Sequence, residues 1–338
     1  MDEIKNGANI DTRSAEAKAK DYKWKELVAS AAPVSWIAKD PASWRKFPIF
    51  NQDGSGSCVA QTEAKELGIM RFLKDGVYVH FSATDIYQRR DPKISGMGAI
   101  NARQIATKGV TLEVLTPSQN MSDGQMDVAV VEEYKRKVGE VFAVPNYLEL
   151  PAKDIEAVAS VIQTTGKGVM VWFYFKIEEW TAHPAVVDNQ LTIETGLRHS
   201  VTAVDWAMVD GKKCLIIEDS WGTAFGMAGQ RVIDEDFFKA RNWYASYLVN
   251  FKFDVPVDQK PHHNFIIDME FGQTNDEIKA LQDCLKWEKL FPSNADSTGY
   301  FGSVTKKSVI DFQAKYGIAQ VGRVGPTTRA KLNELFNS

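Results

Sequence analysis

The sequence has few cysteines and no long apolar run. Three of its 338 residues are cysteine, and their wide spacing suits neither a disulfide framework nor a cysteine-based metal site. No stretch of about 18 apolar residues occurs, so no membrane-spanning helix is expected. The first 30 residues carry charge where a signal peptide needs an apolar segment, so no export signal is expected in this chain.

The chain also lacks an excess of charge of either sign. Lys and Arg number 40 against 44 Asp and Glu, a net charge of −4, which favours neither nucleic acid nor an anionic membrane as a partner. Hydrophobic residues make up 44% of the chain, and the 23 Gly and 12 Pro are spread out, which excludes collagen-like and low-complexity proteins. The length suits about two globular domains.

Hydrophobic patterns predict helices first and strands later. Helices are expected at 15–29, 58–73, 100–108 and 153–165, and glycines follow the last three. Strands are expected at 169–175, 199–209, 213–218, 230–233 and 247–253, and Asp210-Gly211 forms the turn of a hairpin. This order predicts an α+β domain of two lobes, a helical lobe and an antiparallel β lobe.

The two ends of the chain differ from this central domain. Residues 1–33 are polar and charged and are interpreted as an N-terminal arm before a domain at 34–254. Residues 255–273 are rich in Pro, His and Asp and predict a linker. Helices at 276–290, 304–316 and 327–336 then predict a small three-helix module at 274–338. Its core is expected from Leu281, Leu285, Val309, Phe312, Leu332 and Leu335.

Four residues provide the parts of a thiol nucleophile site. Cys58 follows Gly54-Ser55-Gly56-Ser57, a turn that would place its sulfur on the first turn of a helix, where the macrodipole favours a thiolate. His199 is the candidate base and acid, and Asp219 would orient its ring. The Gln52 amide could join the Cys58 N–H in binding an oxyanion.

Three segments that contain these residues resemble the signature segments of papain-family cysteine peptidases. They are FNQDGSGSCVAQT (50–62), GLRHSVTAVDW (196–206) and DSWGTAFGMAGQRVI (219–233), in the family's order. The resemblance spans roughly residues 34–254 and implies the papain-like two-lobe fold, with the active site in the cleft between the lobes. It also implies that Trp221 shields the His199–Asp219 contact from water.

A further segment, SGMGAINARQIATKGV (95–110), resembles the family's substrate-cleft loop and helix. The resemblance implies that Gly96 pairs with the substrate backbone and that Met97 lines the second specificity pocket. An apolar Met97 predicts a preference for a hydrophobic side chain two residues before the scissile bond. A peptide-library profile that favours charge there would contradict this.

The chain departs from the family pattern at several positions. The family usually has Asn at the position of Asp219, an aromatic residue at Val59, and a disulfide-forming cysteine at Ser55. The Asp219 charge predicts a thiolate–imidazolium pair that persists to higher pH than with Asn. The usual propeptide of about 100 residues is absent, so the arm is either a short pro-segment or the enzyme needs none; if it inhibits, deleting the residues before Val34 should raise activity.

The C-terminal module resembles the three-helix peptidoglycan-binding repeat of bacterial and phage wall enzymes. The matching parts include TGYFG (298–302), DFQ (311–313) and VGPTT (324–328). The resemblance implies a shallow groove near Gly302 and Thr305, where exposed backbone N–H groups could meet stem-peptide carboxylates. A generic helical packing module is the alternative.

Together these observations predict a cysteine endopeptidase held at bacterial cell wall, with polypeptides and peptidoglycan as partners and with no cofactor or metal. Cys214 and Cys284 are expected to be buried core thiols, and His262-His263 to lie in a solvated linker. One alternative is a phage or bacterial lysin that cleaves peptidoglycan itself, and another is an inactive wall-binding scaffold. The wall module predicts a location in the cell envelope or outside the cell.

Overall fold

The computed structural model describes residues 7–9, 33–144, 146–182, 196–249, 260–291 and 297–337. They form two units: Met1–Tyr22 with Val34–Lys252, and Lys23–Pro33 with Phe253–Ser338. The helix predicted at 15–29 lies outside the described residues.

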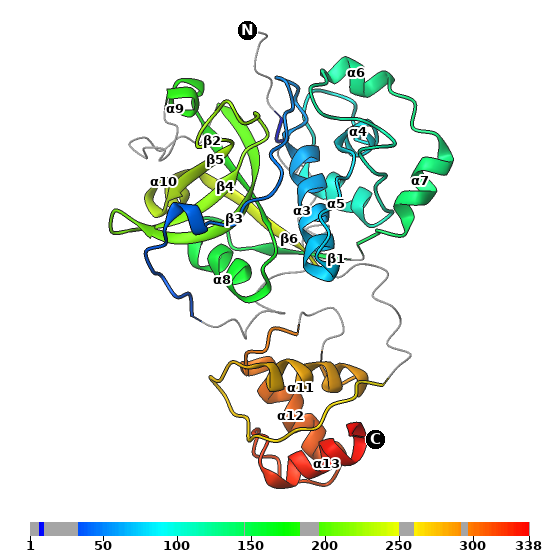
Figure 1. The fold of residues 1–338 in the computed structure, drawn as a ribbon, viewed down its shortest axis with the longest axis vertical. Helices are drawn as coiled ribbons and strands as arrows, with labels where there is room; N and C mark the ends of the chain where they lie inside the picture. The colour runs from blue at the N-terminus through cyan, green and yellow to red at the C-terminus, as the bar shows by residue number, and fades with distance from the viewer. Residues whose placement is uncertain are drawn as a thin grey trace. The chain divides into compact units, whose positions relative to one another are not determined.

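The first unit begins with a helical lobe (Figure 1). It contains the helices α3 (Cys58–Asp75), α4 (Ala83–Gln88), α5 (Ala99–Ala106), α6 (Asp123–Val128) and α7 (Glu133–Glu140), and a short 3-10 helix at Pro41–Ser43 precedes it in the chain. Helix α3 ends as predicted at Gly76, which adopts a left-handed conformation with φ of 76°. Helix α5 ends two residues before its predicted end, and α4, α6 and α7 had no predicted counterpart.

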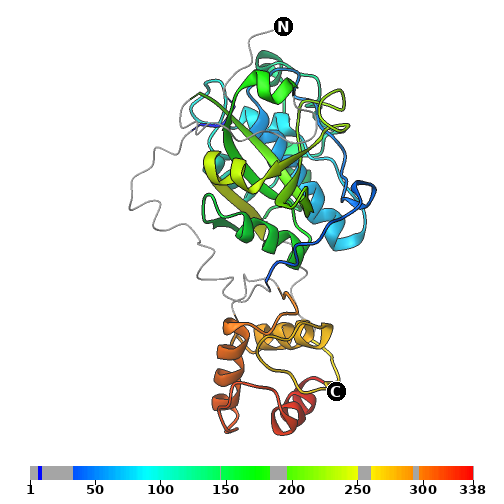
Figure 2. The same cartoon turned by 90° about the vertical axis from the view of Figure 1, so that its left-hand side faces the viewer.

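A six-stranded antiparallel sheet forms the second lobe. Its strands are β1 (Asn146–Leu150), β2 (Val169–Phe175), β3 (Leu197–Val209), β4 (Lys212–Glu218), β5 (Gln230–Asp234) and β6 (Asn242–Val249), in the order β1-β6-β2-β3-β4-β5. Helices α8 (Ile155–Thr165), α9 (Ile177–Ala182) and α10 (Glu235–Arg241) accompany it. Figure 2 views this unit from the side of the sheet. The predicted α+β architecture of two lobes is confirmed.

Two strand predictions have different outcomes. The β3–β4 hairpin turns at Asp210 and Gly211, both with positive φ, as the Asp-Gly pair predicts. Strand β6 begins at Asn242, five residues before the predicted start, because Asn242, Tyr244 and their neighbours pair with β2 in the middle of the sheet. The predicted residues 250–253 lie outside the described residues.

Helix α3 is the centre of the unit and packs against α4, α5, β2, β3 and β6. Residues 58–70 are all buried, including five polar or charged side chains. Both Glu63 and Glu66 bond to the buried Arg103 of α5, at 2.7 and 2.8 Å, and Lys65 bonds to Glu218 of β4 at 2.7 Å. These pairs let a helix that carries charge lie between the two lobes.

The second unit is a three-helix module. It contains α11 (Asp276–Trp287), α12 (Ser303–Lys315) and α13 (Pro326–Phe336). Five of the six predicted core residues are buried, and Leu335 is partly buried against them. The structure extends the module into the predicted linker, because Phe265 and Met269 join this core and Met269 pairs with Val324. Cys214 and Cys284 are buried, as expected.

Candidate active site

The turn before α3 places Cys58 at the first position of that helix. Ser57 is the N-cap residue, so the positive end of the helix dipole lies at the thiol. The Ser55 and Ser57 hydroxyls share a hydrogen bond of 2.7 Å, and the Ser55 N–H donates to the Gln52 carbonyl oxygen at 2.9 Å. These short-range bonds hold the turn in the shape that presents Cys58.

His199 of β3 lies between Cys58 and Asp219. Its Nε2 contacts Asp219 Oδ1 at 2.7 Å, and the imidazole also interacts electrostatically with the Cys58 thiol. Burial by itself lowers the pKa of His199, but the Asp219 carboxylate and the contact with Cys58 outweigh burial and raise this pKa to about 9. The imidazole is therefore placed to keep a proton taken from the thiol and to pass it on.

Gln52 lies beside the same site. Its Nε2 donates to the Ser55 carbonyl oxygen at 2.5 Å, and its Oε1 accepts from the Ser220 hydroxyl at 2.6 Å. A primary amide has two N–H groups, so one remains to meet an oxyanion next to the Cys58 N–H, which lies at the free end of the helix. The structure thus brings Gln52 together with Cys58, His199 and Asp219.

Aromatic rings surround the imidazole. The ring centroid of His199 lies 5.7 Å from that of Trp221, 5.5 Å from Phe175 and 5.9 Å from Trp180. Trp221 is half-buried, as a cover over the His199–Asp219 contact would be, and Trp180 is fully buried. Rings at these distances limit the access of water to the ion pair and strengthen it.

The sequence analysis missed two residues that contact Asp219. The indole N–H of Trp180, on α9, donates to Asp219 Oδ2 at 2.6 Å, and Arg231 Nε donates to the same oxygen at 3.1 Å. Trp180 belongs to none of the recognised segments and lies 39 residues from Asp219. Arg231 could have been found, because a buried aspartate requires a counter-charge and Arg231 lies in the same segment.

The predicted substrate loop lies against the nucleophile turn. Gly96 has a φ of 80° and donates its N–H to the Tyr87 hydroxyl at 3.1 Å, and Met97 is buried. A Cβ on Gly56 would lie 2.8 Å from the Gly96 nitrogen. The approach of the loop to the turn therefore requires a glycine in the turn.

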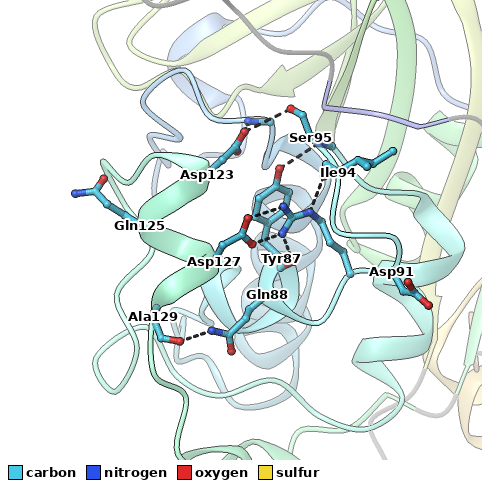
Figure 3. A network of polar contacts seen from close by, with 12 residues as sticks. Tyr87, Gln88, Asp91, Ile94, Ser95, Asp123, Gln125, Asp127 and Ala129 are labelled. Carbon is cyan, nitrogen blue, oxygen red and sulfur yellow. Dashed lines mark hydrogen bonds and ion pairs between the residues drawn. The ribbon is translucent and has the colours of Figure 1, made fainter.

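Asp123, at the start of α6, connects the loop and the turn (Figure 3). Its Oδ1 accepts the Gly56 N–H at 2.8 Å, and its Oδ2 accepts from the Ser95 hydroxyl at 3.4 Å. The Tyr87 hydroxyl accepts the Gly96 N–H and interacts electrostatically with Asp123. Asp123 thus connects the substrate loop, through hydrogen bonds, to the nucleophile turn, in which the family usually has a disulfide-forming cysteine.

Replacing Asp123 by alanine is expected to lower kcat/KM by about 10- to 100-fold, because each lost bond to a buried carboxylate is worth about 1.5–3 kcal/mol. Asp123→Asn retains one acceptor oxygen and should keep most of the activity. The matched control is Asp127→Ala on the same helix, which removes the ion pair with Arg90 at 2.6 Å and should mainly lower the Tm. Equal losses of kcat/KM in Asp123→Ala and Asp127→Ala would contradict this role.

The N-terminal residues 7–9 lie along the substrate loop. The Gly7 carbonyl oxygen accepts the Met97 N–H at 2.9 Å, and the Asn9 N–H donates to the Met97 carbonyl oxygen at 3.0 Å. The bridge between Ala8 and Met97 is parallel. Ala8 is fully buried in the hydrophobic cluster that includes Met97 and Trp172.

Gly7 lies directly against the nucleophile. A Cβ built on Gly7 would lie 2.4 Å from Cys58 Sγ and 2.9 Å from the Gly56 carbonyl oxygen. Only a glycine therefore lets the backbone pass this close to the thiol without displacing it. In this structure the segment 7–9 occupies the surface where the resemblance places the substrate backbone.

In the second unit, the two predicted ligand residues face inward. Thr305 is fully buried, and its hydroxyl accepts from Gln282 Nε2 at 2.9 Å. The Gly302 N–H donates to the Tyr300 carbonyl oxygen at 3.0 Å. Both predicted groups are thus used within the module, because the turn that carries them folds onto α11.

Two hollows of this unit lie elsewhere. One, of about 170 Å³, is lined by residues 318–328 around the start of α13, and the other, of about 190 Å³, by residues 268–273 with Val324. The exposed Arg323 lines both. No helix among the described residues is long and apolar enough to cross a membrane, and the same residues contain no cluster of three or more possible metal ligands.

Comparisons with solved structures and curated proteins place the fold. The crystal structure of xylellain, a cysteine protease from Xylella fastidiosa, superposes with a TM-score of 0.56 at 16% sequence identity. The alignment covers 73% of this chain and 98% of the xylellain chain. Digestive procathepsin L 3 of Tenebrio molitor larval midgut gives a TM-score of 0.51 at 17% identity, covering 69% and 77%. No curated protein matches the sequence.

Family models match both units. The model of the papain family of cysteine proteases matches residues 32–239, more than half of the chain, and the model of a peptidoglycan binding domain matches residues 274–332. The chain therefore belongs to the papain family of cysteine proteases and carries a C-terminal peptidoglycan binding domain.

Proposed function

We propose that this protein is an endopeptidase that cleaves polypeptides through a thioacyl-enzyme on Cys58 and is held at bacterial cell wall by its C-terminal domain. The contact chain from Cys58 through His199 to Asp219, with Gln52 beside it, carries the proposal. In the first step Cys58 Sγ attacks the scissile carbonyl carbon, and Gln52 and the Cys58 N–H stabilise the oxyanion.

His199 then acts as an acid and as a base. It gives its proton to the leaving amine as the C–N bond breaks, which leaves a thioester on Cys58. Water enters, His199 takes one of its protons, and the hydroxide attacks the thioester carbon. The C–S bond breaks, which restores the thiolate–imidazolium pair, and the carboxylic acid product releases its proton to solvent and leaves as a carboxylate.

The N-terminal arm is proposed to be an inhibitory pro-segment. Its residues 7–9 pair with the substrate loop through backbone hydrogen bonds, and Gly7 lies against Cys58. A substrate would need the same loop and the same space at the sulfur. The protease is therefore expected to be active only when this segment leaves the cleft.

The C-terminal domain is proposed to bind the peptide part of peptidoglycan. The two hollows that share Arg323 offer a guanidinium for stem-peptide carboxylates, and the second also contains Asp268 and Glu270, which suit amines. This location replaces the predicted contacts at Gly302 and Thr305, whose polar groups are used internally. Loss of wall binding in Arg323→Ala, with the fold intact, tests it.

A lysin that cleaves peptidoglycan cross-links is the second candidate. The observation that favours it is the size of the residues in the cleft, because Gly7 and Ala8 are as small as the glycine and alanine of such cross-links. The two candidates share the chemistry of Cys58 and differ only in the substrate.

The deciding experiment compares two substrates, an unfolded protein and purified peptidoglycan, under reducing conditions. The intact chain, a chain lacking residues 1–9 and the Cys58→Ala variant of each are assayed together. Cysteine-dependent loss of the protein alone would support a wall-held protease, and loss of peptidoglycan alone would support a lysin. If neither substrate is cleaved by the shortened chain, the proposed activity is wrong.

Labelling with a thiol-reactive epoxide peptide separates an enzyme from an inactive scaffold. Burial raises the pKa of Cys214 and of Cys284 to about 12, so these two thiols should stay unreactive. Labelling of the shortened chain at Cys58, lost in His199→Ala, is the result expected of an enzyme.

A further inference from the structure

The carboxylate of Asp219 is surrounded by four donors. Oδ1 accepts from His199 and from the Ser220 N–H, each at 2.7 Å. Oδ2 accepts from the Trp180 indole N–H at 2.6 Å and from Arg231 Nε at 3.1 Å. One oxygen therefore faces the catalytic imidazole, and the other faces a cation.

Arg231 is buried and held in place. Its guanidinium carbon lies 4.4 Å from the ring centroid of Trp180, so the same indole stacks on Arg231 and donates to Asp219. The side chain of Arg231 is 1% exposed, and Trp180 is 0% exposed. A cation so far from water interacts with its neighbours through a low dielectric.

The charges around the imidazole balance. In the proposed mechanism the Cys58 thiolate and the His199 imidazolium form one pair, and Asp219 with Arg231 forms a second. Lys65 of α3 also faces Asp219 but is bonded to Glu218 of β4 at 2.7 Å. On α9, Glu179 is bonded to Arg241 at 2.6 Å. Without Arg231, the site would carry one uncompensated negative charge.

We propose that Arg231, held against Trp180, is a positioning residue whose charge lets an aspartate orient His199 at a position where the family usually has an asparagine. Arg231 offsets part of the field of Asp219 at the imidazole, so that His199 keeps its orientation and can still release a proton to the leaving amine. The proposal rests on the proposed peptidase mechanism.

The sign of the expected pH effect follows from the charges. The pKa of His199 is raised to about 9, so the imidazolium is present below that pH and is lost above it. Arg231→Met removes a repelling cation, and the alkaline limb of kcat/KM should move up by about one pH unit while kcat falls. In Asp219→Asn the cation is left without its carboxylate, and the limb should move down, with at least about a tenfold loss of kcat/KM.

The decisive variant is Asp219→Asn/Arg231→Met, which is neutral at both positions. We expect it to recover at least about tenfold of the kcat/KM lost in Asp219→Asn, so that Arg231→Met harms the native protein and helps the asparagine background. The matched control is Arg241→Met, which removes another buried arginine paired with a residue of α9. It should lower the Tm and leave the alkaline limb in place.

The measurement is made on the chain lacking residues 1–9, with active sites titrated and the Tm recorded. The ultraviolet absorbance of the Cys58 thiolate against pH reports the ion pair without any substrate. An unchanged thiolate titration in Arg231→Met, or the same effect of Arg231→Met in both backgrounds, would show that Arg231 only supports the fold. If Arg231→Met does not fold, two other variants decide. Arg231→Lys, which keeps the charge, must leave the alkaline limb of kcat/KM at the pH of the native protein, and Asp219→Asn must move that limb to lower pH. Any other result would show that the proposal is wrong.

This design separates the inference from the proposed activity. If the thiolate titration responds to Arg231 as expected but no peptide is cleaved, the proposed function fails and the charge compensation stands. If peptides are cleaved but the thiolate titration does not respond to Arg231, the proposed function stands and the charge compensation by Arg231 is wrong.

Discussion

Gly7→Ala is expected to raise kcat/KM of the full chain roughly tenfold. The added methyl would lie 2.4 Å from Cys58 Sγ and 2.9 Å from a backbone oxygen of the nucleophile turn, so residues 7–9 can no longer stay in the cleft. Overpacking of this kind costs about 1–3 kcal/mol, and 1.4 kcal/mol changes the population of an open cleft by a factor of about ten. The measurement is the initial rate on a small peptide substrate.

Gly124→Ala is the matched control, because a Cβ on Gly124 of helix α6 meets no atom within 4 Å. It should leave the rate unchanged. Deletion of residues 1–9, which removes Gly7 with the whole segment, should raise the rate at least as much as Gly7→Ala. If neither the deletion nor Gly7→Ala raises the rate, the segment does not inhibit this protease.

His199→Ala is expected to lower kcat/KM by about 10⁴-fold in the chain lacking residues 1–9. The variant loses the group that activates the thiol and the acid that protonates the leaving amine. Asp219 keeps its bonds to Trp180, Arg231 and the Ser220 N–H, so the site should still fold. Steady-state kinetics with an equal concentration of folded protein measure the loss.

His80→Ala is the control for this variant. His80 is exposed and packs on Phe50 and Tyr78, and its removal should change kcat/KM by less than a factor of about three. Activity of His199→Ala within a factor of ten of the parent would show that another group acts as the base.

Local sequence was sufficient wherever a short segment carries its own signal. Helix α3 begins at Cys58 and ends at Gly76 because a glycine-serine turn precedes it and a left-handed glycine follows it. The β3–β4 hairpin follows from Asp210-Gly211, which accepts the positive φ of both turn positions. The residues Gln52, Cys58, His199 and Asp219 could be named because their segments have recognisable composition and order.

Sequence by itself determined the family, the two-lobe fold and the C-terminal module of this protein, because each depends on contiguous patterns. Only the tertiary structure decided how the site is supported. Trp180 and Arg231 reach Asp219 from α9 and β5, Asp123 reaches the nucleophile turn from α6, and Gly7 reaches Cys58 from the N-terminal arm. Burial and electrostatic partners act between residues that are distant in the chain, so no local pattern shows that a carboxylate has a cation or that a cleft is filled.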